Sequence, residues 1–173
     1  TFSAQRYELW TMQSAYHNLP TIGGEQQAPG SKFAAADAVY AGDAAAASLS
    51  LSIAGAYPPE AGVVRWDRSF ALSRGGNSAV TITDRFELSE AVPVTLSLMT
   101  PREPVVTTPG ELTLPGDTDV RVSYDASQLD ATVETIEVTD ERLLPVWGER
   151  VYRVLLSSRG PVAEGDWTVR FSA

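Results

Sequence analysis

Cysteine is absent from the 173 residues, which excludes disulfides and thiolate metal sites. This absence does not fix the compartment, because periplasmic and secreted proteins can also lack cysteine. A bacterial periplasmic, secreted or cytoplasmic location therefore stays open. No apolar run approaches the roughly 20 residues that a membrane-spanning helix needs. No signal peptide is recognisable either, so we expect no membrane partner.

Positive charge is also scarce. The 22 acidic residues outnumber the 13 basic ones, Lys32 is the only lysine, and the formal net charge is −9. A nucleic-acid-binding protein needs a basic face, so we exclude nucleic acid as a partner. His17 is the only histidine, which leaves too few imidazoles for a zinc site.

Apolar and polar residues alternate along much of the chain, as they do in strands that bury one face. Residues 48–53 show the strictest alternation. Turn residues such as Pro58-Pro59 and Gly75-Gly76-Asn77 separate the runs at roughly 8–12 residues, the spacing typical of sandwiches and barrels. The sequence predicts one all-β domain over residues 1–173, an antiparallel two-sheet β-sandwich of about a dozen strands with minimal helix.

Helix signals are weak. Alanine-rich stretches at 34–36 and 44–47 are too short to nucleate helices alone, so we expect loops or strand edges there. One helical turn is expected near residues 125–129. The turn-rich segment 100–119 is expected to mark a change of sheet.

Two opposite charges share the parity of apolar neighbours on successive strands. Arg68 alternates in phase with Trp66 and Phe70, and Asp84 alternates in phase with Ile82 and Phe86. A buried charge is costly without a partner. We therefore predict a structural Arg68–Asp84 ion pair across a hairpin, in preference to a ligand-binding role.

His17 is the first candidate for acid–base chemistry, because histidine is the side chain that most readily titrates near neutral pH. A lone histidine is nevertheless more often structural than catalytic. A serine nucleophile in a Gly-x-Ser-x-Gly elbow is absent from the sequence. Trp66 and Trp167 have core parity, whereas Trp147 is expected in an exposed loop, where it could stack on a sugar.

Five short segments in order carry a family resemblance. They are Ser14-Ala15-Tyr16-His17-Asn18, the turn at 20–27, Ala56-Tyr57-Pro58, the strand at 66–70 led by Arg68, and the strand at 82–86 bearing Asp84. Over residues 2–100 the sequence resembles the C-terminal β-sandwich of the heparinase II/III-like polysaccharide lyases. In that family the first segment is expected to be a strand that presents its histidine to the cleft.

The resemblance implies β-elimination on a uronic-acid-containing polysaccharide. By the resemblance, His17 neutralises the substrate carboxylate or acts as an acid or base, and Asn18 and Tyr16 support it. Gln27 and the exposed Trp147 are candidate substrate-binding residues. The family's other catalytic groups belong to an N-terminal α/α toroid, which this sequence lacks. By the resemblance, we therefore expect the chain to be the C-terminal part of a longer chain, inactive alone. The start at Thr1 and not at Met is expected to be a processing site or an artificial boundary.

The expected partners follow from this resemblance. They are an acidic polysaccharide bound with the full-length chain, the chain's own toroid, and a second copy through an apolar face around Tyr7, Leu9 and Trp10. Some relatives hold a metal through two histidines and an aspartate. Asp37 could stand in for that aspartate, but the histidines are missing, so no metal or cofactor is expected. The alternative is a non-catalytic carbohydrate-binding or structural β-sandwich.

Overall fold

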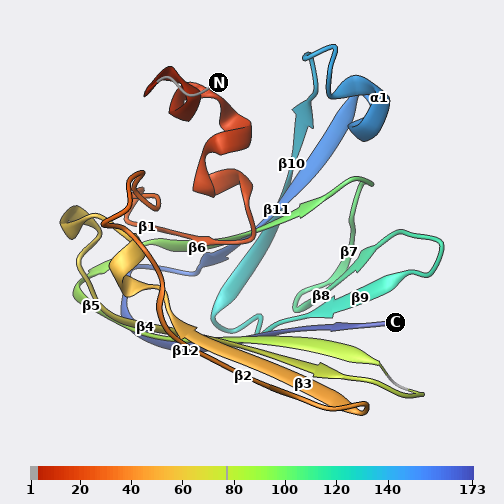
Figure 1. The fold of residues 1–173 in the computed structure, drawn as a ribbon. Helices are drawn as coiled ribbons and strands as arrows, with labels where there is room; N and C mark the ends of the chain where they lie inside the picture. The colour runs from red at the N-terminus through yellow and green to blue at the C-terminus, as the bar shows by residue number, and fades with distance from the viewer. Residues whose placement is uncertain (1–3, 77) are drawn as a thin grey trace.

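Two antiparallel sheets of four and eight strands form the molecule, which confirms the predicted all-β sandwich (Figure 1). The structure is a computed structural model that describes residues 4–76 and 78–173. Asn77, in the predicted turn at 75–77, lies outside the described residues. Within those residues, no helix is both long and apolar enough to cross a membrane.

The small sheet has the strand order β1-β6-β11-β10. Its strands are β1 (Pro20–Ile22), β6 (Val94–Thr100), β10 (Leu129–Glu137) and β11 (Arg150–Ser158). The strand β1 directly follows the segment that contains His17. The segment that contains His17 is therefore held at the edge of this sheet, where residues 20–22 pair with residues 94–96 of β6.

The large sheet has the strand order β2-β3-β4-β5-β12-β9-β8-β7. Its strands are β2 (Ala36–Gly42), β3 (Ala46–Ser52), β4 (Val63–Ser73), β5 (Ala79–Val92), β7 (Val105–Thr108), β8 (Glu111–Leu114), β9 (Val120–Ser123) and β12 (Val162–Ser172). The chain leaves the small sheet after β6 and enters the large one at β7, inside the predicted segment 100–119. The two alanine-rich stretches contribute to β2 and β3, as their assignment to strand edges predicted.

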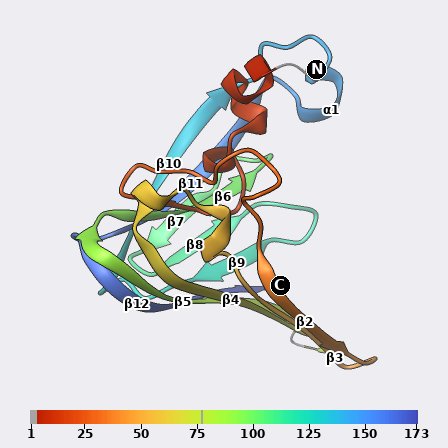
Figure 2. The ribbon, with the colours of Figure 1, turned by 60° about the vertical axis from the view of Figure 1, so that its left-hand side comes forward.

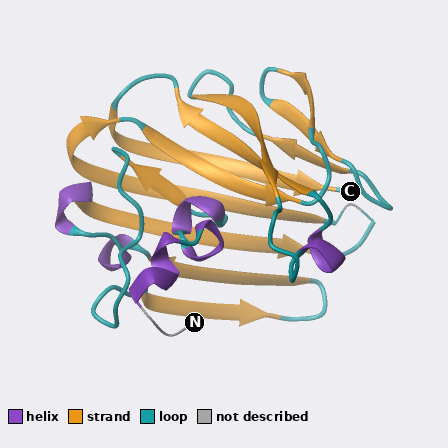
Figure 3. Ribbon diagram, turned by 90° about the horizontal axis from the view of Figure 1, so that it is seen from above, coloured by secondary structure: helices purple, strands orange, loops and turns teal. Residues whose placement is uncertain are grey.

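The helical segments are short and most of them lie above the small sheet (Figures 1 and 2). They are the 3₁₀ helices η1 (Ala4–Glu8), η2 (Trp10–Met12), η3 (Ser14–Tyr16), η4 (Ala54–Ala56) and η5 (Pro59–Ala61), and the α-helix α1 (Leu144–Trp147). In Figure 3, seen from above, the helices are spread from one end of the long strands to the other.

Three local expectations were wrong. The segment expected to be a strand at 14–18 is instead η3 followed by an extended His17. The Ala15 N–H donates to Oε1 of Gln26, and the Gln27 N–H donates to Oγ of Ser14, so the segment folds back on residues 26–27. Trp147, expected in a loop, ends α1. Residues 125–129 make a hydrogen-bonded turn that leads into β10 and not a helix.

An aromatic stack forms the centre of the core. Phe86 stacks on Trp66 with ring centroids 4.4 Å apart and meets Trp167 edge-on at 4.7 Å. Gly165 pairs with Phe86 on the neighbouring strand, and a Cβ at this glycine would lie 2.5 Å from the phenyl ring. Glycine at this position therefore makes room for the ring between β5 and β12.

A fully buried ion pair lies beside that stack. The Arg68 guanidinium donates from Nε to Oδ1 of Asp84 at 2.7 Å and from Nη2 to Oδ2 at 2.9 Å. The indole N–H of Trp66 donates to the same carboxylate at 2.6 Å. The remaining Nη1 of Arg68 donates to the carbonyl oxygen of Asn18 at 2.9 Å. Each charge therefore has the hydrogen bonds that compensate for its burial.

Tyr57 supplies another buried polar contact. Its phenolic O–H donates to the carbonyl oxygen of Pro20 at 2.6 Å and thereby joins the segment after η4 to β1. Burial raises the pKa of Tyr57 well above its usual range, because the phenolate would lose its hydration.

We expect Asp84→Ala to lower the free energy of unfolding by about 3–5 kcal/mol, because it leaves the Arg68 guanidinium buried without its counter-charge. The double change Arg68→Met with Asp84→Leu should recover most of that loss, because both charges disappear together. Urea unfolding followed by tryptophan fluorescence measures both values. A cost below about 1 kcal/mol for Asp84→Ala would contradict this account.

The Tyr57 hydroxyl should also make stability fall in alkaline solution. Since the folded state holds the phenolic proton more tightly than the unfolded chain, the stability is complete below a pH of about 10 and is lost as the pH rises further. Tyr57→Phe should cost about 1 kcal/mol at neutral pH and flatten the alkaline decline. Urea midpoints measured across this pH range test it; an equal decline in both proteins would refute the assignment to Tyr57.

Candidate functional site

His17 lies on the surface between η3 and β1. Its backbone is extended, with φ −120° and ψ 171°, and it is fixed on both sides. The N–H of His17 donates to the Ser14 carbonyl at 3.1 Å, and its own carbonyl accepts the N–H of Leu19 at 2.8 Å. Among the described residues, the imidazole has no hydrogen-bond partner, so an exposed, free ring projects from a fixed backbone.

Asn18 holds this backbone to both sheets. Its side-chain Oδ1 accepts the N–H of Met99 on β6 at 2.8 Å. Its carbonyl accepts the Nη1 hydrogen bond of Arg68 on β4. Asn18 thereby fixes the backbone next to His17, and its support of a catalytic histidine stays a prediction.

Tyr16 is held by an arginine that sequence reasoning did not identify. The guanidinium of Arg153 lies 4.3 Å from the centre of the Tyr16 ring and donates to the Ala15 carbonyl at 2.9 Å. Its Nε also donates to Glu134 on the neighbouring strand at 2.7 Å. The available signal was the opposite charge of Glu134 and Arg153, which lie directly opposite each other on the paired strands β10 and β11.

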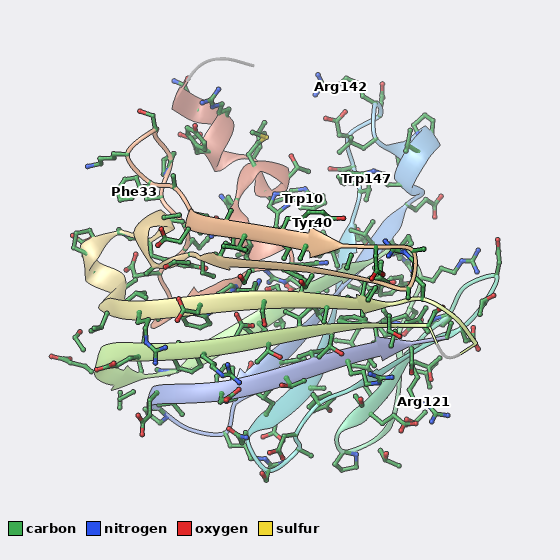
Figure 4. The ribbon with its side chains drawn as sticks, turned by 60° about the horizontal axis from the view of Figure 1, so that its bottom comes forward. Trp10, Phe33, Tyr40, Arg121, Arg142 and Trp147 are labelled. Carbon is green, nitrogen blue, oxygen red and sulfur yellow. The ribbon has the colours of Figure 1, made fainter. Side chains whose placement is uncertain are left out.

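An apolar cleft of about 510 Å³ opens beside His17. We call it the aromatic cleft. Its lining comprises Trp10, Thr11, Tyr16, His17, Asn18, Met99, Thr100, Pro101, Val146, Trp147 and Val151. Trp10 lies 5.3 Å from Tyr16 and 5.9 Å from Trp147 between ring centroids. Figure 4 shows both indoles on the side of the N-terminal helices and α1.

The turn before α1 places Trp147 at the cleft. The carboxylate of Asp140 accepts hydrogen bonds from the Arg142 guanidinium at 2.7 Å and from the Arg142 N–H at 2.9 Å. These bonds lower the pKa of Asp140 to about 2. The backbone N–H of Trp147 donates to the Leu143 carbonyl at 2.9 Å. The Trp147 residue remains 39% exposed.

A second hollow, of about 400 Å³, lies on the other side of His17. We call it the polar hollow. It is lined by Tyr7, Met12, Gln13, Ser14, His17, Leu19, Gln26, Gln27, Ala28 and Pro29. His17 is the one residue that lines both spaces. The structure therefore brings Tyr16, Asn18 and Trp147 together on one side of His17 and places Gln27 on the other.

The remaining candidates lie elsewhere. Arg68 and Asp84 are buried beneath Asn18, and Trp66 and Trp167 are in the core. Asp37 adopts φ 54° on β2 and lines a separate hollow with Asp67 and Arg85.

A metal does not fit these residues. No group of three or more His, Cys, Asp or Glu side chains in the described part of the chain could hold one. His17 is the single histidine of the sequence, so this chain cannot supply the pair of histidines that the resemblance implies for a metal, and no chemical step is derived through one.

The aromatic cleft has few ionisable side chains. Its lining includes no lysine, arginine or carboxylate, so His17 is its only side chain able to carry a positive charge. The site can position a sugar ring and exchange one proton. A second group of opposite function would have to come from outside this lining.

Solved structures share this fold. The heparan sulfate lyase HepC from Pedobacter heparinus matches with a TM-score of 0.72 and 10% identity, over 99% of this chain and 26% of that chain. The heparinase III-BT4657 gene product matches with a TM-score of 0.64 and 11% identity, again over 99% and 26%. Its form with methylated lysines gives 0.66 and 12%, over 95% and 24%.

At the level of sequence, no family profile and no curated protein matches the chain. The chain spans about a quarter of the length of the lyases that it matches in structure. The matching portion is their C-terminal domain, so the resemblance first noted in five short segments holds at the level of the fold. This chain has the fold of the C-terminal β-sandwich of heparan sulfate lyases.

Proposed function

We propose that this chain is the C-terminal domain of a lyase that cleaves a uronic-acid-containing polysaccharide by β-elimination. Its part would be to supply His17 and to complete a cleft against a helical catalytic domain. The observation that carries the proposal is the free imidazole of His17, fixed by Asn18 at the junction of two hollows. The fold of the C-terminal region of heparan sulfate lyases supports it.

β-Elimination sets definite chemical demands. The C5 proton of a uronate is removed, the carboxylate charge is neutralised, and the leaving oxygen is protonated. An imidazolium at His17 would stabilise the carboxylate, and a neutral imidazole would accept or return a proton. One histidine cannot meet all three demands, which is why the proposal includes a second, helical domain.

Apolar side chains near the aromatic cleft support packing on that domain. Leu9, Met12 and Val146 are 48%, 47% and 78% exposed. Leu9 and Met12 flank Trp10 in the chain, and Val146 precedes Trp147 on α1, and these two tryptophans are in contact. Exposed apolar groups gathered in one region often mark an interaction surface. In the absence of the helical domain, the same surface would favour association of two copies.

In a longer protein that contains this chain and a helical domain, His17→Ala should lower kcat/KM by about 10²–10⁴-fold, because a positioned acid–base group is lost. The unsaturated uronate product absorbs ultraviolet light, so absorbance measures the rate. The isolated chain should show no turnover, since the other catalytic groups are missing.

The matched control is Arg85→Ala. It removes a charged group that pairs with Asp166 in an exposed ion pair on the large sheet and lines neither the aromatic cleft nor the polar hollow. The control should keep the parent activity. Equal rates for His17→Ala and the parent protein, with both proteins folded, would overturn the proposed role of His17.

A non-catalytic carbohydrate-binding module is the second candidate, and the aromatic cleft favours it. Trp10 and Trp147 present indole faces of the kind that stack on sugars, in a space large enough for a sugar ring. In that case the chain alone would bind oligosaccharides tightly, His17→Ala would leave the Kd unchanged, and the longer protein would release no unsaturated product.

A further inference from the structure

The two spaces that meet at His17 differ in chemistry. The aromatic cleft has indole and aliphatic walls, whereas the polar hollow carries three glutamine side chains and a serine hydroxyl. A linear chain of sugars that crosses His17 would therefore place successive units in unlike surroundings. This difference allows each space to be matched to a kind of sugar.

The polar hollow offers unused hydrogen-bonding groups. Gln13 uses its Nε2, which donates to the Tyr7 carbonyl at 3.1 Å, and Gln26 uses its Oε1, which accepts the Ala15 N–H at 3.1 Å. Among the described residues, Oε1 of Gln13 and Nε2 of Gln26 have no partner. A hydroxyl-rich ligand could satisfy both the acceptor and the donor.

Arg6 contacts Tyr7, one of the residues that line this hollow. The Arg6 guanidinium donates to the Tyr7 hydroxyl and lies 4.6 Å from the centre of the Tyr7 ring, which lines the hollow. Its Nε is buried and has no hydrogen-bond partner in the described part of the chain. No carboxylate there lies within ion-pair distance of Arg6, although the protein carries a net charge of −9. A guanidinium in this state favours an anionic ligand.

The aromatic cleft favours an uncharged ring. No charged side chain other than His17 could balance a carboxylate or sulfate group there. Burial of an anion without a partner is unfavourable, whereas the C–H face of a sugar gains by stacking on an indole. Trp147 is partly exposed and available for that contact.

We infer that an acidic polysaccharide crosses His17 in one direction, with an acidic sugar in the polar hollow beside Arg6 and a neutral sugar ring in the aromatic cleft against Trp147. The inference rests on the proposed function, which assigns a carbohydrate to this surface. It adds the order of the two sugars.

Two monosaccharides test the assignment on the 173-residue chain: glucuronate as the acidic probe and N-acetylglucosamine as the neutral probe. Glucuronate should shift the side-chain amide NMR signals of Gln13 and Gln26. Arg6→Gln should weaken glucuronate binding roughly tenfold, and added salt should weaken it as well. N-Acetylglucosamine should change the tryptophan fluorescence, and Trp147→Ala should weaken its binding roughly tenfold.

Each variant has a matched control. Arg85→Gln removes an exposed arginine outside both spaces, and Tyr40→Ala removes an aromatic residue that is 71% exposed and lines neither of them. Both controls should bind the two probes as the parent chain does. The salt dependence checks the charge assignment without any substitution.

The inference is overturned if glucuronate binding is unaffected by Arg6→Gln, if both sugars perturb the same space, or if neither sugar binds at millimolar concentration. None of these results changes the expected loss of activity of His17→Ala in the longer protein. A failure of the sugar order and a failure of the proposed lyase function are therefore distinguishable.

Discussion

The buried pair of Arg68 and Asp84 is the interaction on which the rest of the structure depends. It joins β4 to β5, accepts the indole N–H of Trp66 from the aromatic stack, and reaches the carbonyl of Asn18 through one remaining N–H. One guanidinium thus satisfies a core carboxylate and a surface loop together. Such a pair gives little net stability compared with apolar packing, but it strongly penalises any arrangement in which one member is missing.

Strand periodicity predicted most of this architecture. Alternation and turn spacing predicted the two-sheet fold. Strand parity placed Arg68 and Asp84 on one inward face, and in the structure Nε of Arg68 lies 2.7 Å from Oδ1 of Asp84. Parity works here because strand side chains alternate strictly between the two faces of a sheet. The tryptophans in phase with these strands, Trp66 and Trp167, are buried for the same reason.

The site was less predictable, because contacts between distant segments shape it. Residues 14–16 form a 3₁₀ turn where a strand was expected. Hydrogen bonds with Gln26 and Gln27, about a dozen positions away, hold this turn, as does Arg153 from the far end of the chain. Nothing local in the sequence signals these contacts. The pairing of Trp10 with Trp147, which builds the aromatic cleft, likewise joins two segments that one sequence cannot place together.

Asn18 has a further consequence. Its two oxygens take hydrogen bonds from opposite layers of the sandwich, one from Met99 and one from Arg68. The spacing between the layers therefore sets the height of the neighbouring imidazole above the surface. The packing of the core, which includes the Phe86 ring and the space left by Gly165, therefore affects the position of the His17 imidazole. A substitution in the core could thus displace the His17 imidazole without contacting it. Such a protein would be well folded, but its imidazole would lie in a different position.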